Sequence, residues 1–549
     1  MIHHLLISMV KTLPTKIFYN RRLGSQLKTI FNLDSIGHSW GLLLTFTLGF
    51  VVRLIPEVLS WPYPIGFDTI YYGARIKNGV IWCHWSEFFS STWLLYGILI
   101  PVNNLIRGDP FILLKFTAPL LYSLNACGIY YFARKALSWS VKKAFLAAFF
   151  FVFQLASLRI SWDLHRNMLA LGLLLFTLTF IKDFKNKWSV FCFVPLSVLV
   201  VWGHELASVV LFVIVSGLVL EHLRRDKHSD TYRVVVAVAP AFILFLIGIY
   251  LRVFPIEYHV ETNVIDVHDR VLASLGGLFF LVDYLHIVSS YQHYPTYLDL
   301  FSNILSLFGL LYLLSLPLIL IGFFRNCVLD FWTLFLLIGS FNALVTPFCA
   351  LNWWDRWMCM LVYPFTFYAV NGILRVFSSK ESSVKCSPHF LGWLRLSKVS
   401  VSMILSFIVL LSLIFMSVRF ETGGLLYTPY TIAYFPSTML HNTVLLQDVD
   451  GAIKAFGWLD ENLDNGSVVL AQHALLGWAL FYLGRRISIV YYVRDVDVAL
   501  DLSLDLGFDR VYLVWWSENT AWYGLEVPND FVSIRDFGDI SIFKYVGER

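Results

Sequence analysis

The chain has 549 residues, of which 58% are hydrophobic and only 14% charged, and its mean hydropathy is +0.68. A soluble globular domain has about 25% charged residues. These values exclude a soluble globular protein, a coiled coil and a disordered chain, and they predict a polytopic membrane protein. The seven cysteines include no Cys-x-x-Cys pair, so neither a zinc site nor a disulfide framework is expected.

The net charge of +4 is divided unevenly along the chain. Residues 420–549 contain 17 acidic and 8 basic side chains, whereas the preceding residues have a net charge of +13. The basic side chains fall in short connections between apolar runs and form no stripe with interleaved aromatics. We therefore expect a membrane as partner and no nucleic acid.

Apolar runs predict about eleven transmembrane helices. The runs cover residues 39–57, 111–132, 144–160, 167–181, 188–203, 206–221, 234–254, 298–323, 329–349, 357–376 and 400–418. Alternate connections hold 22 of the 41 Lys and Arg residues, which the positive-inside rule assigns to the cytoplasm. Residues 1–38, which show no cleavable signal peptide, are then a basic cytoplasmic N-terminus, and residues 39–419 are the transmembrane domain.

Residues 420–549 are predicted to form an α/β domain outside the cytoplasm, because an odd number of spans precedes them. The predicted helices are Asp448–Leu463, Leu475–Leu483 and Val496–Leu506, and the predicted strands are Ser467–Ala471, Ile487–Tyr492 and Arg510–Trp515. A closing hairpin is expected from Phe531–Ile534 and Ile540–Tyr545. Alternating strands and helices favour a mostly parallel sheet.

Polar side chains collect in the connections assigned to the outer face. In the first, residues 58–110, Asp68 follows a Pro/Gly break and lies among aromatics, including Tyr71 and Tyr72. A carboxylate beside an apolar wall can have a raised pKa and act as a base. It can equally bind a hard cation or cap the helix that starts near Thr69.

Three further outer connections are short and contain ionisable groups. The second contains Asp163, His165 and Arg166, which can share a metal or a phosphate or simply form a polar turn. In the third, His204 and Glu205 lie between two apolar spans, either near the outer face or within one long broken helix. The fourth contains Asp355 and Arg356 among tryptophans, which form a lipid-phosphate site or an aromatic interface belt.

These four segments all bring polar groups to one face, whereas a midplane transporter would place them deep in the bilayer. A longer outer segment, Phe254–Pro295, is interpreted as a partly mobile loop over the site.

In these features the chain resembles the GT-C membrane glycosyltransferases, which take sugars from polyprenyl-phosphate carriers. Asp68-Thr69-Ile70-Tyr71-Tyr72 is similar to their first-loop acidic motif. Asp163-Leu164-His165 is similar to the second-loop motif of the oligosaccharyltransferase catalytic subunit, and Arg356-Trp357 through Tyr363-Pro364-Phe365 to the late helix whose Arg lies near the donor phosphate. The start of the C-terminal domain, Ala455–Asn462 with Ser467–Ala471, also resembles that subunit.

The resemblance implies an inverting glycosyltransferase with Asp68 as catalytic base. Arg356, His165 and Arg166 would bind the donor phosphate, and Asp68, Asp163 and His165 would hold a divalent cation, Mg²⁺ or Mn²⁺, if one is used. His204, Glu205, Tyr71, Tyr72 and Asp355 are second-tier candidates. The donor would be a polyprenyl-phosphate-linked sugar, the acceptor a lipid, glycan or protein, and the location a prokaryotic plasma membrane.

One stretch departs from the oligosaccharyltransferase pattern. Where that subunit has a Trp-Trp-Asp-Tyr-Gly signature, this chain has Gln472-His473-Ala474-Leu475-Leu476. The departure favours transfer of a single sugar, or another acceptor, over glycan transfer to protein. Two alternatives stay open, namely an oligosaccharyltransferase and a transporter or flippase for lipid-linked sugars.

Overall fold

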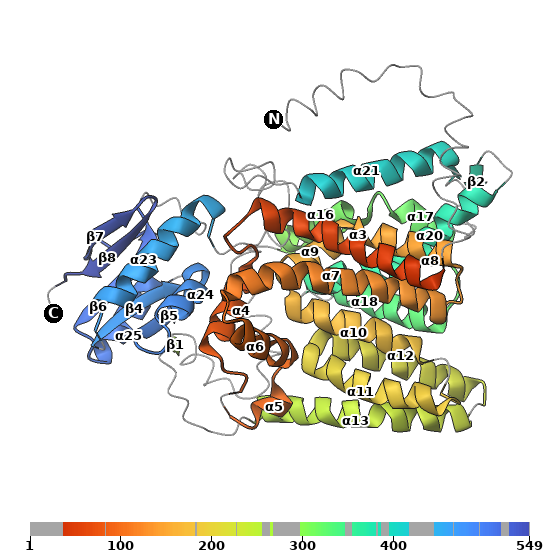
Figure 1. Cartoon of the computed structure of the whole chain (residues 1–549), viewed down its shortest axis with the longest axis horizontal. Helices are drawn as coiled ribbons and strands as arrows, with labels where there is room; N and C mark the ends of the chain where they lie inside the picture. The colour runs from red at the N-terminus through yellow and green to blue at the C-terminus, as the bar shows by residue number, and fades with distance from the viewer. Residues whose placement is uncertain are drawn as a thin grey trace, which may run out of the picture.

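The protein is mostly helical, with a helical bundle at one end and a smaller domain built on a sheet at the other (Figure 1). The computed structural model describes residues 37–82, 84–181, 184–226, 228–254, 264–266, 297–345, 354–379, 383–385, 395–416, 444–464, 466–493, 495–517 and 526–547. The predicted class, an α-helical membrane protein with a C-terminal α/β domain, is confirmed.

Six helical segments among the described residues are long and apolar enough to cross a membrane. They are α3 (His38–Leu59), α7 (Pro110–Lys135), α12 (Glu205–Arg224), α13 (His228–Val253), the pair α19 (Trp354–Met360) and α20 (Val362–Ser378), and α21 (Lys398–Met416). Large apolar side chains on these helices face outward, as a lipid environment requires. Examples are Val51, Phe116, Ile243 and Phe407, each more than half exposed.

Two further segments pass the same test as bent pairs. They are α8 (Val141–Val152) with α9 (Leu155–Asp163), bent by 62°, and the end of α16 (Tyr297–Tyr312) with α17 (Leu316–Gly322), bent by 71°. The other predicted runs form α10 (His165–Thr179), α11 (Lys187–Gly203) and α18 (Cys327–Val345). The described residues thus contain six to eight candidate spans, and the count of eleven stays a prediction.

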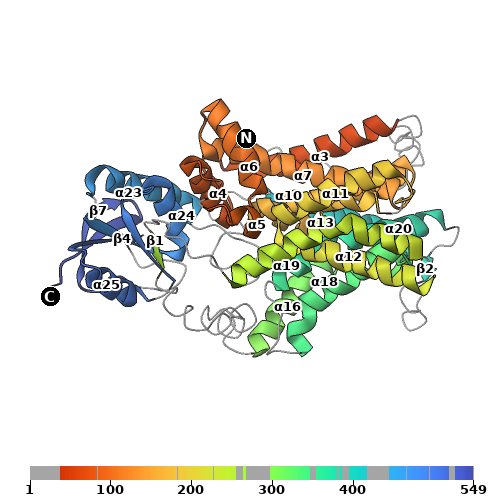
Figure 2. The ribbon, with the colours of Figure 1, turned by 90° about the horizontal axis from the view of Figure 1, so that it is seen from below.

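The first predicted outer connection, residues 58–110, is largely helical. It contains α4 (Phe67–Asn78), the short α5 (Glu87–Ser90) and α6 (Leu94–Ile106). Both views of the ribbon place α4 between the bundle and the C-terminal domain (Figures 1 and 2). Phe111 at the start of α7 and Ile70 and Ala74 of α4 belong to the hydrophobic core of the C-terminal domain.

The C-terminal domain has a six-stranded sheet in the order β1-β5-β4-β6-β8-β7. Its strands are β1 (Val264–Asp266), β4 (Ser467–Gln472), β5 (Ser488–Tyr492), β6 (Arg510–Trp516), β7 (Phe531–Phe537) and β8 (Ile540–Tyr545). Its helices are α23 (Val449–Asn462), α24 (His473–Tyr482) and α25 (Val496–Asp505). Strands β5, β4 and β6 pair in parallel and β8 and β7 form an antiparallel hairpin, as predicted. All six residues of β4 are buried, as expected for a central parallel strand.

Strand β1 (Val264–Asp266) comes from the segment predicted to be a mobile loop. It pairs in parallel with β5, Val264 opposite Ile489. At these three residues the prediction is wrong, because backbone hydrogen bonds add them to the edge of the sheet. Apart from Phe254, the rest of Phe254–Pro295 lies outside the described residues.

A small hairpin, β2 (Ser383–Lys385) with β3 (Arg395–Ser397), lies between α20 and α21.

Candidate functional site

Helix α4 begins directly against the end of α9. Gly66, the residue before α4, has a φ of 92°, a conformation that side chains rarely adopt. A Cβ atom at Gly66 would lie 2.6 Å from the Trp162 carbonyl oxygen and 2.8 Å from the Asp163 Cβ. The chain therefore needs glycine here, and the close approach brings the first turn of α4, with Asp68, beside Asp163.

Asp68 lies in the first turn of α4 and does not cap it, because Gly66 occupies the cap position without any side-chain hydrogen bond. The capping alternative for Asp68 is therefore wrong. Its carboxylate accepts a hydrogen bond from the Tyr72 hydroxyl, with 3.4 Å between Oδ2 and the hydroxyl oxygen. The positive end of the α4 dipole also favours a negative charge at this position.

The two neighbouring tyrosines of the predicted motif point to different partners. Tyr72 is buried, and its ring centroid lies 5.3 Å from that of His165. The Tyr71 hydroxyl donates a 2.8 Å hydrogen bond to the carbonyl oxygen of His473 in the C-terminal domain. Tyr72 therefore contacts the carboxylate, whereas Tyr71 joins α4 to the other domain.

The sharp break between α9 and α10 presents three polar side chains. Asp163 ends α9 and pairs with Arg159 of the same helix, with 2.5 Å between Nη1 and Oδ1. His165 starts α10 and is only 2% exposed, and within the described part of the chain neither ring nitrogen has a hydrogen-bond partner. The Arg166 guanidinium donates to the Thr92 hydroxyl at 2.9 Å and lies 5.9 Å from the Tyr72 ring centroid.

Burial and the charges of these segments together shift the pKa of Asp68. Burial raises the pKa of its carboxyl above the ordinary value, and the neighbouring Asp163 raises it further. The cations Arg356, Arg166 and Arg159 oppose this shift without cancelling it. Burial and the Asp68 charge also raise the pKa of Tyr72, so its hydroxyl stays protonated and able to donate.

Side chains of the third and fourth predicted segments interact electrostatically with the same region. Glu205 interacts with Arg166, and Arg356 interacts with Asp68. Asp355 interacts with Arg159, which in turn interacts with Asp68. His204 instead caps α12, where its Nδ1 accepts a hydrogen bond from the Leu206 amide at 3.1 Å. That cap favours the structural interpretation of His204.

The predicted metal set does not form a three-ligand site. Within the residues that the structure describes, no group of three or more His, Cys, Asp or Glu side chains lies close enough to hold a metal ion. One Asp163 oxygen is bonded to Arg159, and His165 lies face to face with Tyr72 at a 31° tilt. The use of Mg²⁺ or Mn²⁺ stays a prediction, because two carboxylates together with substrate phosphates can also hold such a cation.

Several residues of this region were not singled out from the sequence. Arg159 is one, although an arginine four residues before an aspartate on an apolar helix is a usable signal for an ion pair. Tyr96 packs edge-on against Tyr72, and Arg75 lies 4.3 Å from the Tyr96 ring centroid. Tyr96 belongs to α6, so no spacing in the sequence connects it to Asp68, whereas Arg75 lies on α4 itself.

No known family model and no curated protein matches the chain. Among solved structures, that of ArnT from Cupriavidus metallidurans in the apo state aligns with 91% of this chain and 97% of its own. The two sequences are 14% identical over this alignment, and the TM-score is 0.45. The alignment covers nearly all of both chains. A likeness with this sequence identity and TM-score assigns no activity to this protein.

Proposed function

We propose that the protein is a membrane glycosyltransferase of the GT-C type, which transfers a sugar from a polyprenyl-phosphate-linked donor to an acceptor at the outer face. The observation that carries the proposal is the convergence of three separate chain segments on Asp68, namely the start of α4, the α9–α10 connection and α19. Together they supply a carboxylate of raised pKa, a second carboxylate and three arginines. A base beside a cluster of cations suits a reaction in which an acceptor hydroxyl loses a proton while a phosphate leaves.

Asp68 is the proposed base, because Tyr72 orients its carboxylate and its raised pKa makes it a better proton acceptor than an ordinary Asp. Asp163 is less suited to this role, since Arg159 occupies one of its oxygens. Arg356 and Arg166 are the proposed phosphate ligands. Both keep part of their surface exposed, as Asp68 does, so a ligand can reach all three.

An apolar groove of about 360 Å³ supports a lipid-linked donor. Helices α12, α13 and α18 line it, and its first residue on α12, Val209, lies one helical turn after Glu205. A polyprenyl chain in this groove would have its phosphate near the site.

The test is release of lipid phosphate from a labelled polyprenyl-phosphate hexose by the full-length protein in nanodiscs. We expect Asp68→Asn to lower turnover by about 10²–10⁴-fold with donor binding retained, because the base is lost. Arg356→Ala should weaken donor binding. Asp109→Asn is the matched control, since Asp109 caps α7 on the same outer connection and Asn caps equally well.

Equal turnover by wild type and Asp68→Asn would contradict the proposal. If the wild type binds the donor and moves it across the bilayer without turnover, the protein is a carrier instead. Each protein is assayed with and without Mg²⁺ and Mn²⁺. Turnover that persists in the presence of a chelator would show that the reaction needs no divalent cation.

A further inference from the structure

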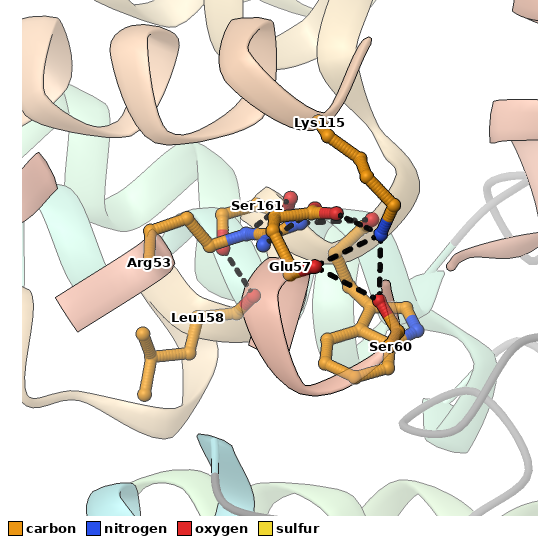
Figure 3. A network of polar contacts seen from close by, with 7 residues as sticks. Arg53, Glu57, Ser60, Lys115, Leu158 and Ser161 are labelled. Carbon is orange, nitrogen blue, oxygen red and sulfur yellow. Dashed lines mark hydrogen bonds and ion pairs between the residues drawn. The ribbon is translucent and has the colours of Figure 1, made fainter. Parts of the chain in front are cut away.

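Three ionisable side chains that the proposed reaction does not use lie together inside the bundle. Arg53 and Glu57 belong to α3 and Lys115 to α7, and each is less than 5% exposed. One Glu57 oxygen lies 2.8 Å from Arg53 Nη1, and the other lies 3.2 Å from Lys115 Nζ (Figure 3). Charged groups within membrane-spanning helices are costly and usually serve a function.

The network has two cations and one carboxylate, and backbone oxygens compensate for the excess positive charge. Arg53 Nε donates to the Ser161 carbonyl at 3.1 Å, and its Nη2 lies 3.5 Å from the Trp162 carbonyl. These oxygens belong to the last turn of α9, where carbonyl groups have no partner within the helix and the helix dipole is negative. Arg53 therefore holds the helix end that bears Asp163.

Lys115 holds the other side of the site. Its ammonium group donates to the Ser60 hydroxyl at 2.7 Å and to the Glu57 carbonyl at 3.0 Å. Ser60 is the residue that ends α3, and the segment from it leads to Gly66 and Asp68. Lys115 thus fixes the start of the segment that carries the proposed base.

The helix end held by Arg53 and the segment that follows Ser60 meet at Trp162. The Trp162 carbonyl that faces Arg53 is the same oxygen against which Gly66 packs. One connected network therefore holds the backbone just before Asp68 and the backbone just before Asp163. Glu57 links the two cations of this network, Arg53 and Lys115.

We propose that Arg53, Glu57 and Lys115 are positioning residues that set the separation of Asp68 and Asp163. The proposal rests on the proposed function, since the separation matters for a base whose ionisation depends on its neighbour. The groups that face Asp68 from the packed elements are Asp163 and Arg159 of α9, Arg166 of α10, Arg356 of α19 and Tyr72 of its own helix.

Removing either cation leaves one cation paired with Glu57, so Arg53→Met and Lys115→Met leave no unpaired buried charge and should fold. We expect each to lower kcat at least tenfold with the KM for the donor changed less than threefold, and to shift the acid limb of the pH profile. Arg53→Lys keeps the charge, but a lysine cannot reach Glu57 and both carbonyls together, so it should rescue little.

The matched control is Tyr368→Phe. It removes another hydrogen bond to a carboxylate of the bundle, the part-buried 3.0 Å bond to Asp330, away from this network. The kcat of Tyr368→Phe should stay within twofold of wild type, although its loss of thermal stability is comparable to that of Arg53→Met. If Arg53→Met behaves as Tyr368→Phe does, the network is only structural and the inference is wrong.

Amide hydrogen exchange in nanodiscs gives a readout that needs no activity. Arg53→Met should speed exchange in residues 60–69 and 160–165 and leave the rest of the bundle unchanged, whereas Tyr368→Phe should not affect these two segments. Unchanged or uniformly faster exchange would overturn the inference even if the wild type is active. A wild type that turns over no donor would refute the proposed function instead, and a local exchange effect would then still support the structural link.

Discussion

At the scale of single residues, the ionisation of Asp68 is the property on which the proposed chemistry depends most. Asp163 and burial raise its pKa, whereas three arginines lower it. A base must be ionised to accept a proton, so activity is present above the pKa of Asp68 and is lost as the pH falls through it. The acid limb therefore reports this carboxylate.

We expect the acid limb of kcat/KM to lie above about pH 4, the ordinary pKa of an aspartate. Asp163→Asn should move the limb to lower pH, because it removes a negative charge that raises the pKa of Asp68. The measurement is the pH dependence of lipid-phosphate release by the two proteins. A limb that stays in place in Asp163→Asn would show that the two carboxylates do not interact.

At the scale of elements, two faces of α4 contact different parts of the protein. One presents Asp68 and Tyr72 to α9 and α10, and the other packs Ile70 and Ala74 into the core of the C-terminal domain. Since residues one position apart on a helix point about 100° apart, neighbouring side chains can serve different partners.

The adjacent tyrosines of α4 test this division. Tyr72→Phe should lower activity about tenfold, because Asp68 loses the hydroxyl that orients it and a hydrogen bond to a charged group contributes about 1.5–3 kcal/mol. Tyr71→Phe should instead lower the melting temperature of the protein by a few degrees through the lost bond to His473. Turnover and thermal unfolding of both variants are compared, and the reverse pattern would contradict the assignment of the faces.

At the scale of the whole molecule, the C-terminal domain is part of the site's support. Besides the Tyr71 bond, Lys77 Nζ donates to the Phe481 carbonyl at 2.8 Å, and the Phe67 and His473 ring centroids lie 5.0 Å apart. Gly477 of α24 packs against Ile70, where an added Cβ would lie 2.5 Å from the Ile70 Cγ2. A change in this contact should reach Asp68 through α4.

Gly477→Ala should therefore destabilise the protein by about 1–3 kcal/mol and lower activity, because the extra methyl group overpacks the contact. In a chain that already carries Ile70→Ala, the substitution Gly477→Ala should lower both much less, since the atoms that clash are gone. Thermal unfolding and turnover of the two single variants and the double variant give the coupling energy. Strictly additive effects would show that α24 and α4 do not transmit strain at this point.

The sequence by itself determined the membrane class, the apolar helices and the order of strands and helices in the C-terminal domain. It also predicted that the segments of Asp68, Asp163, Glu205 and Arg356 belong to one region. These features depend on local properties, namely hydropathy over a span, alternation of strands and helices, and the positions of polar residues relative to apolar runs.

Only the tertiary structure decided which side chains meet. It turned Tyr72 toward Asp68 and Tyr71 away, used His204 as a helix cap, and added Val264–Asp266 to a sheet more than 200 residues away in the sequence. It also showed the Arg53–Glu57–Lys115 network, whose partners on α9 lie about 100 residues from Arg53. Such contacts depend on the packing of distant helices, and no local pattern in one sequence encodes which partners that packing brings together.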